Sequence, residues 1–175
     1  MLVVDNLSPF TADILTCLGQ LDNPHLHKRF SEGSNEELAQ CNRVILSGRR
    51  KHSKEINTVN SRIIRYCHYH KKPLLGICYG AEIIALPLGG SIRKMQDHVQ
   101  GTTEVSLSSA NPLTKGKKSI LVYESHRYCI AKLPSNFKSL ASSKYCDHEV
   151  FSNDCKIYGT QFHPEKSGDD GLALL

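Results

Sequence analysis

Residues 72–85 read KPLLGICYGAEIIA, a short apolar run that leads into the apolar start of a helix. The run predicts a buried strand, so Cys78 falls at a strand-to-helix turn. Gly76 and Gly80, two residues on either side, leave room for close packing and can hold the side chain between them in an exposed, strained position. We therefore expect a nucleophile elbow, where the positive end of the helix dipole favours a thiolate. A buried cysteine that only packs would give the same local pattern.

A general base for this thiol is available near the end of the chain. Residues 158–167 read YGTQFHPEKS, in which an alternating strand-like pattern stops at Pro164 between His163 and Glu165. A histidine can deprotonate a cysteine, and a carboxylate can hold the imidazole in the required tautomer. The two segments together predict a Cys78-His163-Glu165 triad, although the sequence alone does not prove that they meet.

The combination of GICYG at 76–80 and QFHPE at 161–165 resembles the class I (triad-type) glutamine amidotransferase family, and the likeness extends over most of the chain. Other segments resemble different members and leave the subfamily open. The start of the chain is similar to the glutaminase subunits of anthranilate and aminodeoxychorismate synthases, at Asp5-Asn6, Phe10-Thr11 and Leu18-Gly19. The GMP synthetase glutaminase is similar at Glu124-Ser125-His126 and Leu133-Pro134-Ser135-Asn136-Phe137. The glutaminase of imidazole glycerol phosphate synthase is similar at His163-Pro164-Glu165-Lys166-Ser167 and Gly171-Leu172.

The resemblance implies an activity and a role for each matching residue. Cys78 would attack the side-chain amide of glutamine to give a glutamyl thioester and ammonia, and water would then release glutamate. His163 would act as base and then as acid, Glu165 would orient it, and the backbone N–H of Tyr79 would bind the oxyanion. The ammonia would pass to a synthase partner, in aromatic/folate, purine or histidine biosynthesis, and no cofactor is implied.

The chain departs from the family pattern at two positions. Relatives carry a Gly/Pro-rich loop after the strand that ends at Gly48, and here Arg49 occupies the second glycine position. A positive φ costs a non-glycine residue about 1 kcal/mol, so either the loop has another shape or the oxyanion donor forms only when substrate or a partner binds. Relatives usually have Gln four residues after the cysteine, where this chain has Glu82, which could attract the substrate ammonium or mark an altered specificity. The basic residues 49–54 fit equally a solvated loop or a docking patch for an acidic partner.

Two further histidines are weighed as alternative bases. His98 lies in an alternating segment with no carboxylate at an orienting position, so we interpret it as a surface residue. His126 belongs to a segment whose family counterparts line the glutamine pocket, which also makes Arg127 and Tyr128 candidate substrate-binding residues. His126 is therefore interpreted as a pocket or structural residue.

The order of apolar runs predicts a single α/β domain over residues 1–175, with a flavodoxin-like, mostly parallel central sheet and helices on both faces. The reactive groups should gather at the carboxyl ends of its strands. Ser8 is expected to cap the first helix, with Pro9 at its first position, and the polar segment up to Ser34 is interpreted as a solvated edge rather than a strand. We expect strands at 1–5, 43–48, 74–77, 97–107, 119–123, 140–146, 149–151 and 156–162, and helices at 8–19 and 57–70 and after Cys78.

Net charge, cysteine content and the N-terminal residues indicate the expected location and partners of the protein. The formal charge is +5, from 22 basic and 17 acidic side chains, but the sequence has no basic stripe interleaved with aromatic residues, so no nucleic-acid partner is expected. Seven cysteines without paired spacing predict reduced thiols, a cytoplasmic location and no metal site. The N-terminal apolar run is too short for a signal peptide, and no membrane association is expected.

Two other classes of function stay open. One is a hydrolase of another γ-glutamyl or related amide, which the departures at Arg49 and Glu82 keep in consideration. The other is a relative without catalytic activity that binds a partner or metabolite, which the complete set of triad residues disfavours.

Overall fold

The computed structural model describes residues 1–108, 117–153 and 156–175. Within them the strands form one sheet of nine, in the order β2-β1-β3-β4-β9-β8-β7-β5-β6. The strands are β1 (Leu2–Asp5), β2 (Leu26–Arg29), β3 (Val44–Leu46), β4 (Leu74–Ile77), β5 (Ser91–Leu107), β6 (Ser119–Lys132), β7 (Phe137–Ser142), β8 (Val150–Asn153) and β9 (Ile157–Thr160). The helices are α1 (Thr11–Gln20), α2 (Asn35–Gln40), α3 (Lys54–Tyr69), α4 (Tyr79–Ala85) and α5 (Gly168–Leu172), with 3₁₀ turns η1 (Leu86–Leu88) and η2 (Pro164–Lys166).

The sheet has a parallel half and an antiparallel half. Strands β2, β1, β3, β4 and β9 run parallel, with Leu46 opposite Gly76 and Gly76 opposite Gly159. Strands β8, β7, β5 and β6 continue the sheet in antiparallel pairs. The predicted α/β fold with a central parallel sheet is confirmed, and it is the carboxyl ends of the parallel half that converge on Cys78.

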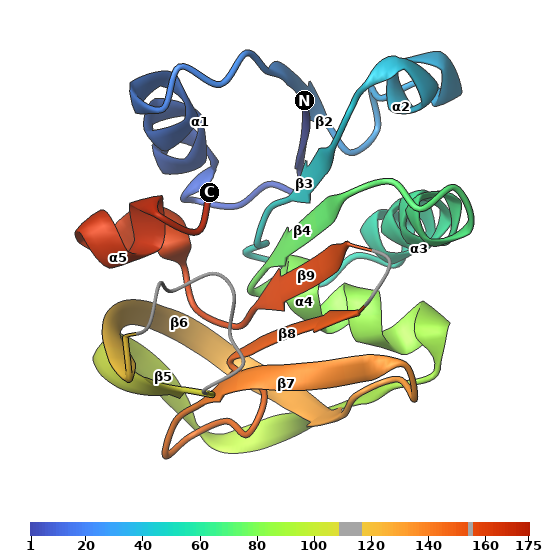
Figure 1. Ribbon diagram of the computed structural model, residues 1–175. Helices are drawn as coiled ribbons and strands as arrows, with labels where there is room; N and C mark the ends of the chain where they lie inside the picture. Colours follow the sequence, from blue (N-terminus) through green and yellow to red (C-terminus); the bar gives the residue numbers. More distant parts are fainter. Residues whose placement is uncertain (109–116, 154–155) are drawn as a thin grey trace.

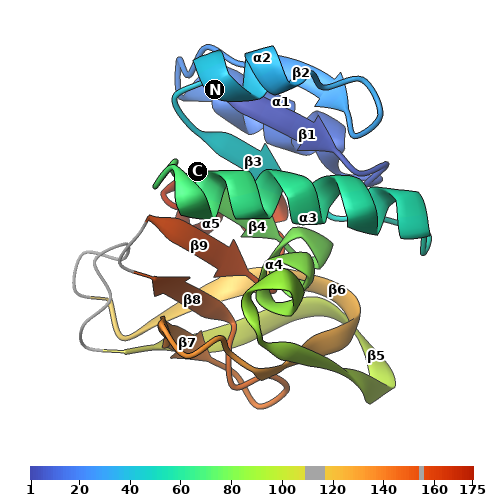
Figure 2. The ribbon, with the colours of Figure 1, turned by 90° about the vertical axis from the view of Figure 1, so that its right-hand side faces the viewer.

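Helices cover both faces of the parallel half (Figures 1 and 2). Because successive side chains of a strand point to opposite faces, alternate strand residues enter different cores. Val3, Ile45 and Ile77 pack with Ile14 and Leu18 of α1. The residues that face the other side pack with α2, α3 and α4: Leu2, Val4, Val44, Leu46 and Leu74 from the strands, and Leu38, Ile56, Ile63, Ile64 and Ile84 from the helices. Helix α5 lies on the same side as α1 (Figure 1).

The first helix begins later than predicted. Its N-cap is Phe10, not Ser8, and Thr11 is its first residue. The turn before it is held by Asp5, whose Oδ1 accepts from the backbone N–H of Leu7 and Ser8 and from the Thr11 hydroxyl. A carboxylate at the end of β1 therefore organises the turn that the sequence pattern assigned to a serine cap.

Segment 26–29 is a strand, which the sequence analysis did not predict. Strand β2 pairs in parallel with β1 at the sheet edge, where three of its four residues are exposed. An edge strand needs neither a buried face nor a second neighbour, so its polar sequence carries little of the usual strand pattern. In the antiparallel half, β5 and β6 are longer than predicted and pair with an irregularity between Lys94 and Val99.

Candidate active site

Cys78 occupies the strained turn that the two flanking glycines predicted. Its backbone has φ 51° and ψ −106°, between β4 and α4. A side-chain carbon at Gly76 would lie 2.4 Å from the backbone of Gly80, and one at Gly80 would lie 2.3 Å from the carbonyl oxygen of Leu46. The strand, the turn and the helix therefore pack at a distance that only glycine allows at both positions.

The Cys78 side chain is buried, contrary to the expectation of an exposed thiol. Only 6% of the residue is accessible, and its Sγ lies 3.8 Å from the carbonyl oxygen of Ser125 on β6. The antiparallel half of the sheet, whose pairing the local sequence does not reveal, therefore passes next to the thiol.

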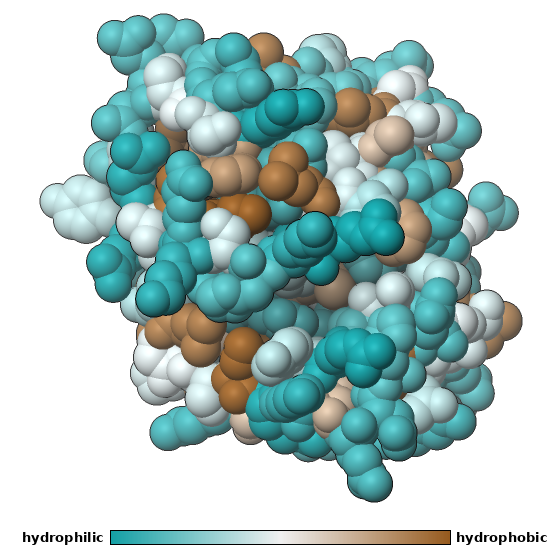
Figure 3. Space-filling view, turned by 180° about the vertical axis from the view of Figure 1, so that it is seen from behind, coloured by the Kyte–Doolittle hydropathy of each residue, from teal (hydrophilic) through white to brown (hydrophobic). Residues whose placement is uncertain are grey.

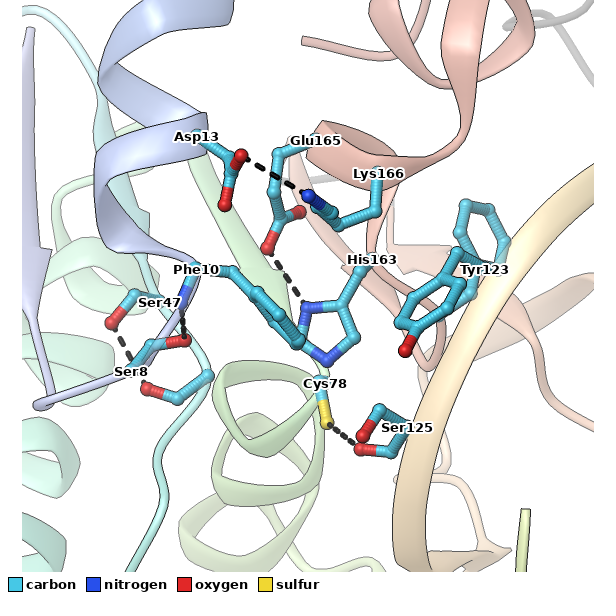
Figure 4. A network of polar contacts seen from close by, with 12 residues as sticks. Ser8, Phe10, Asp13, Ser47, Cys78, Tyr123, Ser125, His163, Glu165 and Lys166 are labelled. Carbon is cyan, nitrogen blue, oxygen red and sulfur yellow. Dashed lines mark hydrogen bonds and ion pairs between the residues drawn. The ribbon is translucent and has the colours of Figure 1, made fainter. Parts of the chain in front are cut away.

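His163 and Glu165 follow strand β9, beside the elbow. The His163 Nδ1 atom lies 2.8 Å from the Glu165 Oε1 atom, and Nε2 is directed toward Cys78 (Figure 4). The His163 backbone N–H donates to the carbonyl of Tyr123 at 2.9 Å, and the Phe10 ring packs edge-to-face against the imidazole with centroids 4.7 Å apart. The imidazole is thus fixed on three sides, with its free nitrogen facing the thiol.

Gly48 borders the same space. A side-chain carbon there would lie 3.2 Å from His163 Cε1 and 3.8 Å from Cys78 Cβ. The end of β3 therefore approaches both reactive side chains, and a residue larger than glycine would displace the imidazole. The predicted residues from β3, β4 and β9 come together at one point of the sheet.

The electrostatic setting of Cys78 differs from the expected one. Burial raises the pKa of the thiol well above its ordinary value, and the carboxylates of Glu82 and Glu165 raise it further, while the backbone N–H of Tyr79 lowers it. Burial and two nearby acidic groups thus outweigh the helix N-terminus. In the free site these effects favour the protonated thiol over the thiolate.

Arg49 adopts a loop shape that avoids a strained backbone. It is not among the described non-glycine residues with positive φ. Its guanidinium carbon lies 3.8 Å from the centroid of the Tyr79 ring, and its Nη1 donates to Asn57 Oδ1 at 2.7 Å. The Tyr79 hydroxyl donates to the same oxygen at 2.8 Å. The strained arginine backbone that a glycine-like conformation would require is therefore absent from this loop. Formation of the oxyanion donor only when substrate or a partner binds, the other explanation weighed for Arg49, stays a prediction.

The backbone donors beside the elbow are available for a ligand. Within the described part of the chain, no group accepts a hydrogen bond from the backbone N–H of Gly48 or Arg49. These N–H groups and that of Tyr79 are the candidates for an oxyanion site next to Cys78.

Glu82 lies inside the site, on the first turn of α4, and is 6% exposed. Its Oε1 accepts from Gln161 Nε2 at 3.2 Å. Burial raises the pKa of this carboxyl, and the Gln161 hydrogen bond with the nearby charges of His126, Arg49 and His163 only partly offsets that effect.

The remaining candidates are placed differently. Arg127 and Tyr128 are exposed on β6 and form no hydrogen bond or ion pair with the triad side chains, so their part in substrate binding stays a prediction. His126 turns inward and is 4% exposed. His98 is exposed, and its slight burial together with the charge of Arg127 lowers its pKa.

Sequence reasoning missed two residues that shape the site, Phe10 and Asn57, and it placed Ser125 only within the segment whose family counterparts line the glutamine pocket. Each acts through a contact between segments far apart in the chain, and Ser125 acts through its main-chain carbonyl, which no sequence motif encodes.

Several structural findings concern other kinds of site. Across residues 1–108, 117–153 and 156–175, no group of three or more His, Cys, Asp and Glu side chains is arranged to hold a metal ion. No helix in those ranges is long and apolar enough to cross a membrane.

The face seen from behind is mostly hydrophilic, with separate apolar patches (Figure 3). Six cysteines in these ranges are free thiols, and Cys155 lies outside the described residues.

A thiol on a strained strand-to-helix turn, with an imidazole and a carboxylate lined up behind it, is the arrangement of an α/β protein built for nucleophilic attack on an acyl carbon. The family model described as "Glutamine amidotransferase class-I" matches residues 2–173, and the chain belongs to this family.

Individual proteins with similar sequences include glutamine-hydrolysing subunits of GMP synthase. The chain is 37% identical to the glutamine-hydrolysing GMP synthase subunit of Thermoplasma acidophilum, over 75% of this chain and 66% of that protein. It is 35% identical to the corresponding subunit of Saccharolobus solfataricus, over 80% of this chain and 76% of that protein. It is also 38% identical to the GMP synthase of Borreliella burgdorferi, of which the matched region is only 24%.

A crystal structure described as a GMP synthase subunit of Thermoplasma acidophilum superposes with a TM-score of 0.87 at 31% identity, covering 99% of this chain and 88% of that chain. A glutamine amidotransferase of Thermotoga maritima superposes with a TM-score of 0.80 at 20% identity, covering 94% of this chain and 75% of that chain, and supports the fold alone.

Proposed function

We propose that this chain is a glutaminase domain that hydrolyses the side-chain amide of glutamine and delivers the ammonia to a synthase partner that makes GMP. The observation that carries the proposal is the contact of Glu165 with His163 Nδ1, which leaves Nε2 directed toward Cys78 (Figure 4). Residues 1–175 act as one such domain, in the cytoplasm and without a cofactor. The choice among the candidate subfamilies rests on the similarity to the glutamine-hydrolysing subunits of GMP synthases.

The first half of the reaction forms a thioester. His163 Nε2 takes the proton of the Cys78 thiol while the sulfur bonds to the amide carbon of glutamine, and the carbonyl oxygen becomes an oxyanion. The oxyanion accepts hydrogen bonds from the N–H of Tyr79 and from the N–H groups of the Gly48 loop. The carbon–nitrogen bond then breaks as the imidazolium gives its proton to the leaving nitrogen, and ammonia departs.

The second half releases glutamate. His163 takes a proton from water, and the hydroxyl oxygen bonds to the thioester carbon. The carbon–sulfur bond breaks, and the imidazolium returns its proton to the sulfur. Glu165 accepts the hydrogen bond of His163 Nδ1 and stabilises the positive imidazole in each half. The raised pKa of Cys78 fits this sequence, because proton removal is coupled to attack and no free thiolate is needed.

Labelling with a glutamine-derived chloroketone tests the assignment of Cys78. Mass spectrometry should find the label on Cys78 alone, and Cys78→Ala should abolish both labelling and glutamate release. Cys41→Ala is the matched control, because this half-buried thiol lies after α2 and donates to the carbonyl of Leu38, away from the site. Labelling spread over several thiols, or retained in Cys78→Ala, would contradict the proposal.

The choice of substrate needs a separate measurement. Release of ammonia from glutamine should exceed release from other γ-glutamyl amides, and addition of the synthase subunit of a GMP synthase should support glutamine-dependent GMP formation. Faster turnover of another γ-glutamyl amide would favour the alternative hydrolase, to which the carboxylate of Glu82 points.

A further inference from the structure

A second group of titratable side chains lies buried beside the candidate site. Glu124 and His126 lie on β6, and Ser143 and Glu149 lie on the loop between β7 and β8; together we call them the carboxyl–histidine cluster. Glu124 and Glu149 are 0% exposed and His126 is 4% exposed. Buried ionisable groups cost several kcal/mol unless each is paired, so their protons must be arranged in a definite way.

The ring of His126 has acceptors at both nitrogens. Nδ1 lies 2.8 Å from the carbonyl oxygen of Tyr128, which can only accept, so Nδ1 carries a hydrogen. Nε2 lies 2.9 Å from Glu124 Oε2, close enough for an ion pair although not aligned as a hydrogen bond. A second hydrogen on Nε2 would make the ring an imidazolium that faces the Glu124 carboxyl at ion-pair distance. Burial is the largest single effect and lowers the pKa of His126, but Glu124, the carbonyl of Tyr128 and the charge of Glu82 together raise it by more, so the net shift is upward.

The second carboxyl of the cluster, Glu149, is assigned the protonated form. Glu149 Oε1 accepts from the Ser143 hydroxyl at 2.6 Å, whereas Oε2 has no donor among the described residues. The side chain lies against Glu124, and two carboxylates in contact inside a protein cannot both be ionised. A proton on Glu149 supplies the missing donor between them. Burial, followed by the charge of Glu124, raises the pKa of Glu149.

The cluster is joined to the reactive residues by the main chain of β6. Glu124 and His126 face inward on either side of Ser125, whose carbonyl oxygen lies 3.8 Å from Cys78 Sγ. One residue before Glu124, the carbonyl of Tyr123 accepts from the backbone N–H of His163. Strand residues 123–125 therefore contact both the nucleophile and the base, and the cluster lies directly behind them.

We propose that Glu124, His126 and Glu149 are positioning residues that hold residues 123–125 against Cys78 and His163, through one carboxylate, one imidazolium and one carboxylic acid. The expected effect on turnover rests on the proposed glutaminase function. The assignment of protons to Glu124, His126 and Glu149 does not depend on that function.

Other charged or titratable groups also face the cluster. The charge of Glu82 on α4 acts on His126. The thiols of Cys129 on β6 and Cys146 on the β7–β8 loop lie close enough to Glu149 to sense a charge there. The cluster has a net charge of zero in the proposed state, which is the arrangement that burial favours.

Two isosteric variants separate the roles of the carboxyls. Glu149→Gln should keep kcat within about threefold, because the amide NH₂ replaces the acid O–H as donor and its oxygen still accepts from Ser143. Glu124→Gln should lower kcat by about tenfold or more with a smaller change in KM, because His126 loses its counter-ion. Equal effects, or a more damaging Glu149→Gln, would overturn the proton assignment.

Nitrogen-15 spectra of His126 give a readout that does not depend on activity or on the folding of Glu124→Gln. In the wild-type chain both ring nitrogens should have imidazolium shifts at pH 7, and Glu149→Gln should leave them unchanged. A neutral ring at pH 7 would overturn the proposal. If the spectra agree but no glutamate is released by the wild-type chain or its complex, the proposed function fails while the proton assignment stands.

Discussion

His163 Nδ1 lies 2.8 Å from Glu165 Oε1, and the two side chains are almost fully buried on either side of Pro164. The proline belongs to the 3₁₀ turn η2, which brings residues two apart in sequence onto the same side of the chain. Because Nδ1 is committed to the carboxylate, Nε2 is the nitrogen left for Cys78. The buried thiol has a raised pKa and needs a base for the proposed reaction, and Nε2 is the ring nitrogen directed toward it.

The two residues should therefore differ in their contribution to turnover. His163→Ala is expected to lower kcat for glutamate release by at least about 10³-fold, since proton transfer and thiol activation are lost together. Glu165→Gln should also lower kcat, because an amide NH₂ that donates to Nδ1 favours the wrong imidazole tautomer, but the loss should be smaller than in His163→Ala. Steady-state kinetics at a fixed pH provides the comparison, and full activity in His163→Ala would transfer the role of base to another histidine.

Gly48 should tolerate no side chain. In Gly48→Ala the new methyl would lie 3.2 Å from His163 Cε1, so the imidazole must move away from Cys78. We expect kcat to fall by about tenfold or more while the unfolding temperature changes little, because a small displacement of a reacting group is costly. Gly19→Ala is the control: it lies in α1 with open space around it and should leave the kinetics unaltered. Normal turnover in Gly48→Ala would show that the imidazole does not need its present position.

Arg49 is expected to support activity rather than to limit it. Its guanidinium stacks on Tyr79 and binds Asn57, so Arg49→Gly frees the loop that carries two candidate oxyanion donors. Glutamate release by the isolated chain should fall about 3- to 30-fold, while Arg50→Gly, the exposed neighbour, should have no effect. A faster Arg49→Gly would mean that the arginine holds the loop in an inactive shape.

The sequence sufficed for the parts of the site that depend on local geometry. The strained turn at Cys78 follows from glycines two residues away, and the contact of His163 with Glu165 follows from the proline between them. Parallel strands then bring both segments to the same edge of the sheet, as the alternation of strand and helix predicted.

Other features of the site depend on contacts with residues far away in the chain, which the local sequence pattern does not identify. The burial of Cys78 comes from Ser125 on β6, about fifty residues along the chain, and this burial reversed the expected effect of the helix on the thiol pKa. The loop shape at Arg49 depends on Asn57 of α3, which no motif connects to it. The sequence analysis places Glu124 only within the segment whose family counterparts line the glutamine pocket, and Glu149 only at the start of a short strand. The pairing of the antiparallel half buries both carboxyls in the core.

Glu82 provides a prediction on pH. Its folded pKa is raised above the ordinary carboxyl value, so its contribution to stability is complete below that value and is lost as the pH rises through the folded pKa. In Glu82→Gln no carboxyl titrates at this position, so the variant does not lose this contribution to stability as the pH rises. The difference in unfolding temperature between Glu82→Gln and the wild type should therefore be small near pH 4.5 and should grow in favour of the variant toward pH 8.

The same change should alter the reactivity of Cys78. The charge of Glu82 is the second cause, after burial, of the raised thiol pKa, and the variant lacks it. Its amide can also donate to Gln161 Oε1, a buried oxygen that has no donor among the described residues. We expect alkylation of Cys78 by neutral iodoacetamide at pH 8 to be several-fold faster in Glu82→Gln than in the wild type, because a lower pKa leaves more thiolate. Glu104→Gln is the control, since this exposed β5 carboxyl accepts from Ser119 on the neighbouring strand, away from the site. An unchanged alkylation rate, together with a pH-independent difference in unfolding temperature, would mean that Glu82 is already ionised and compensated in the folded protein.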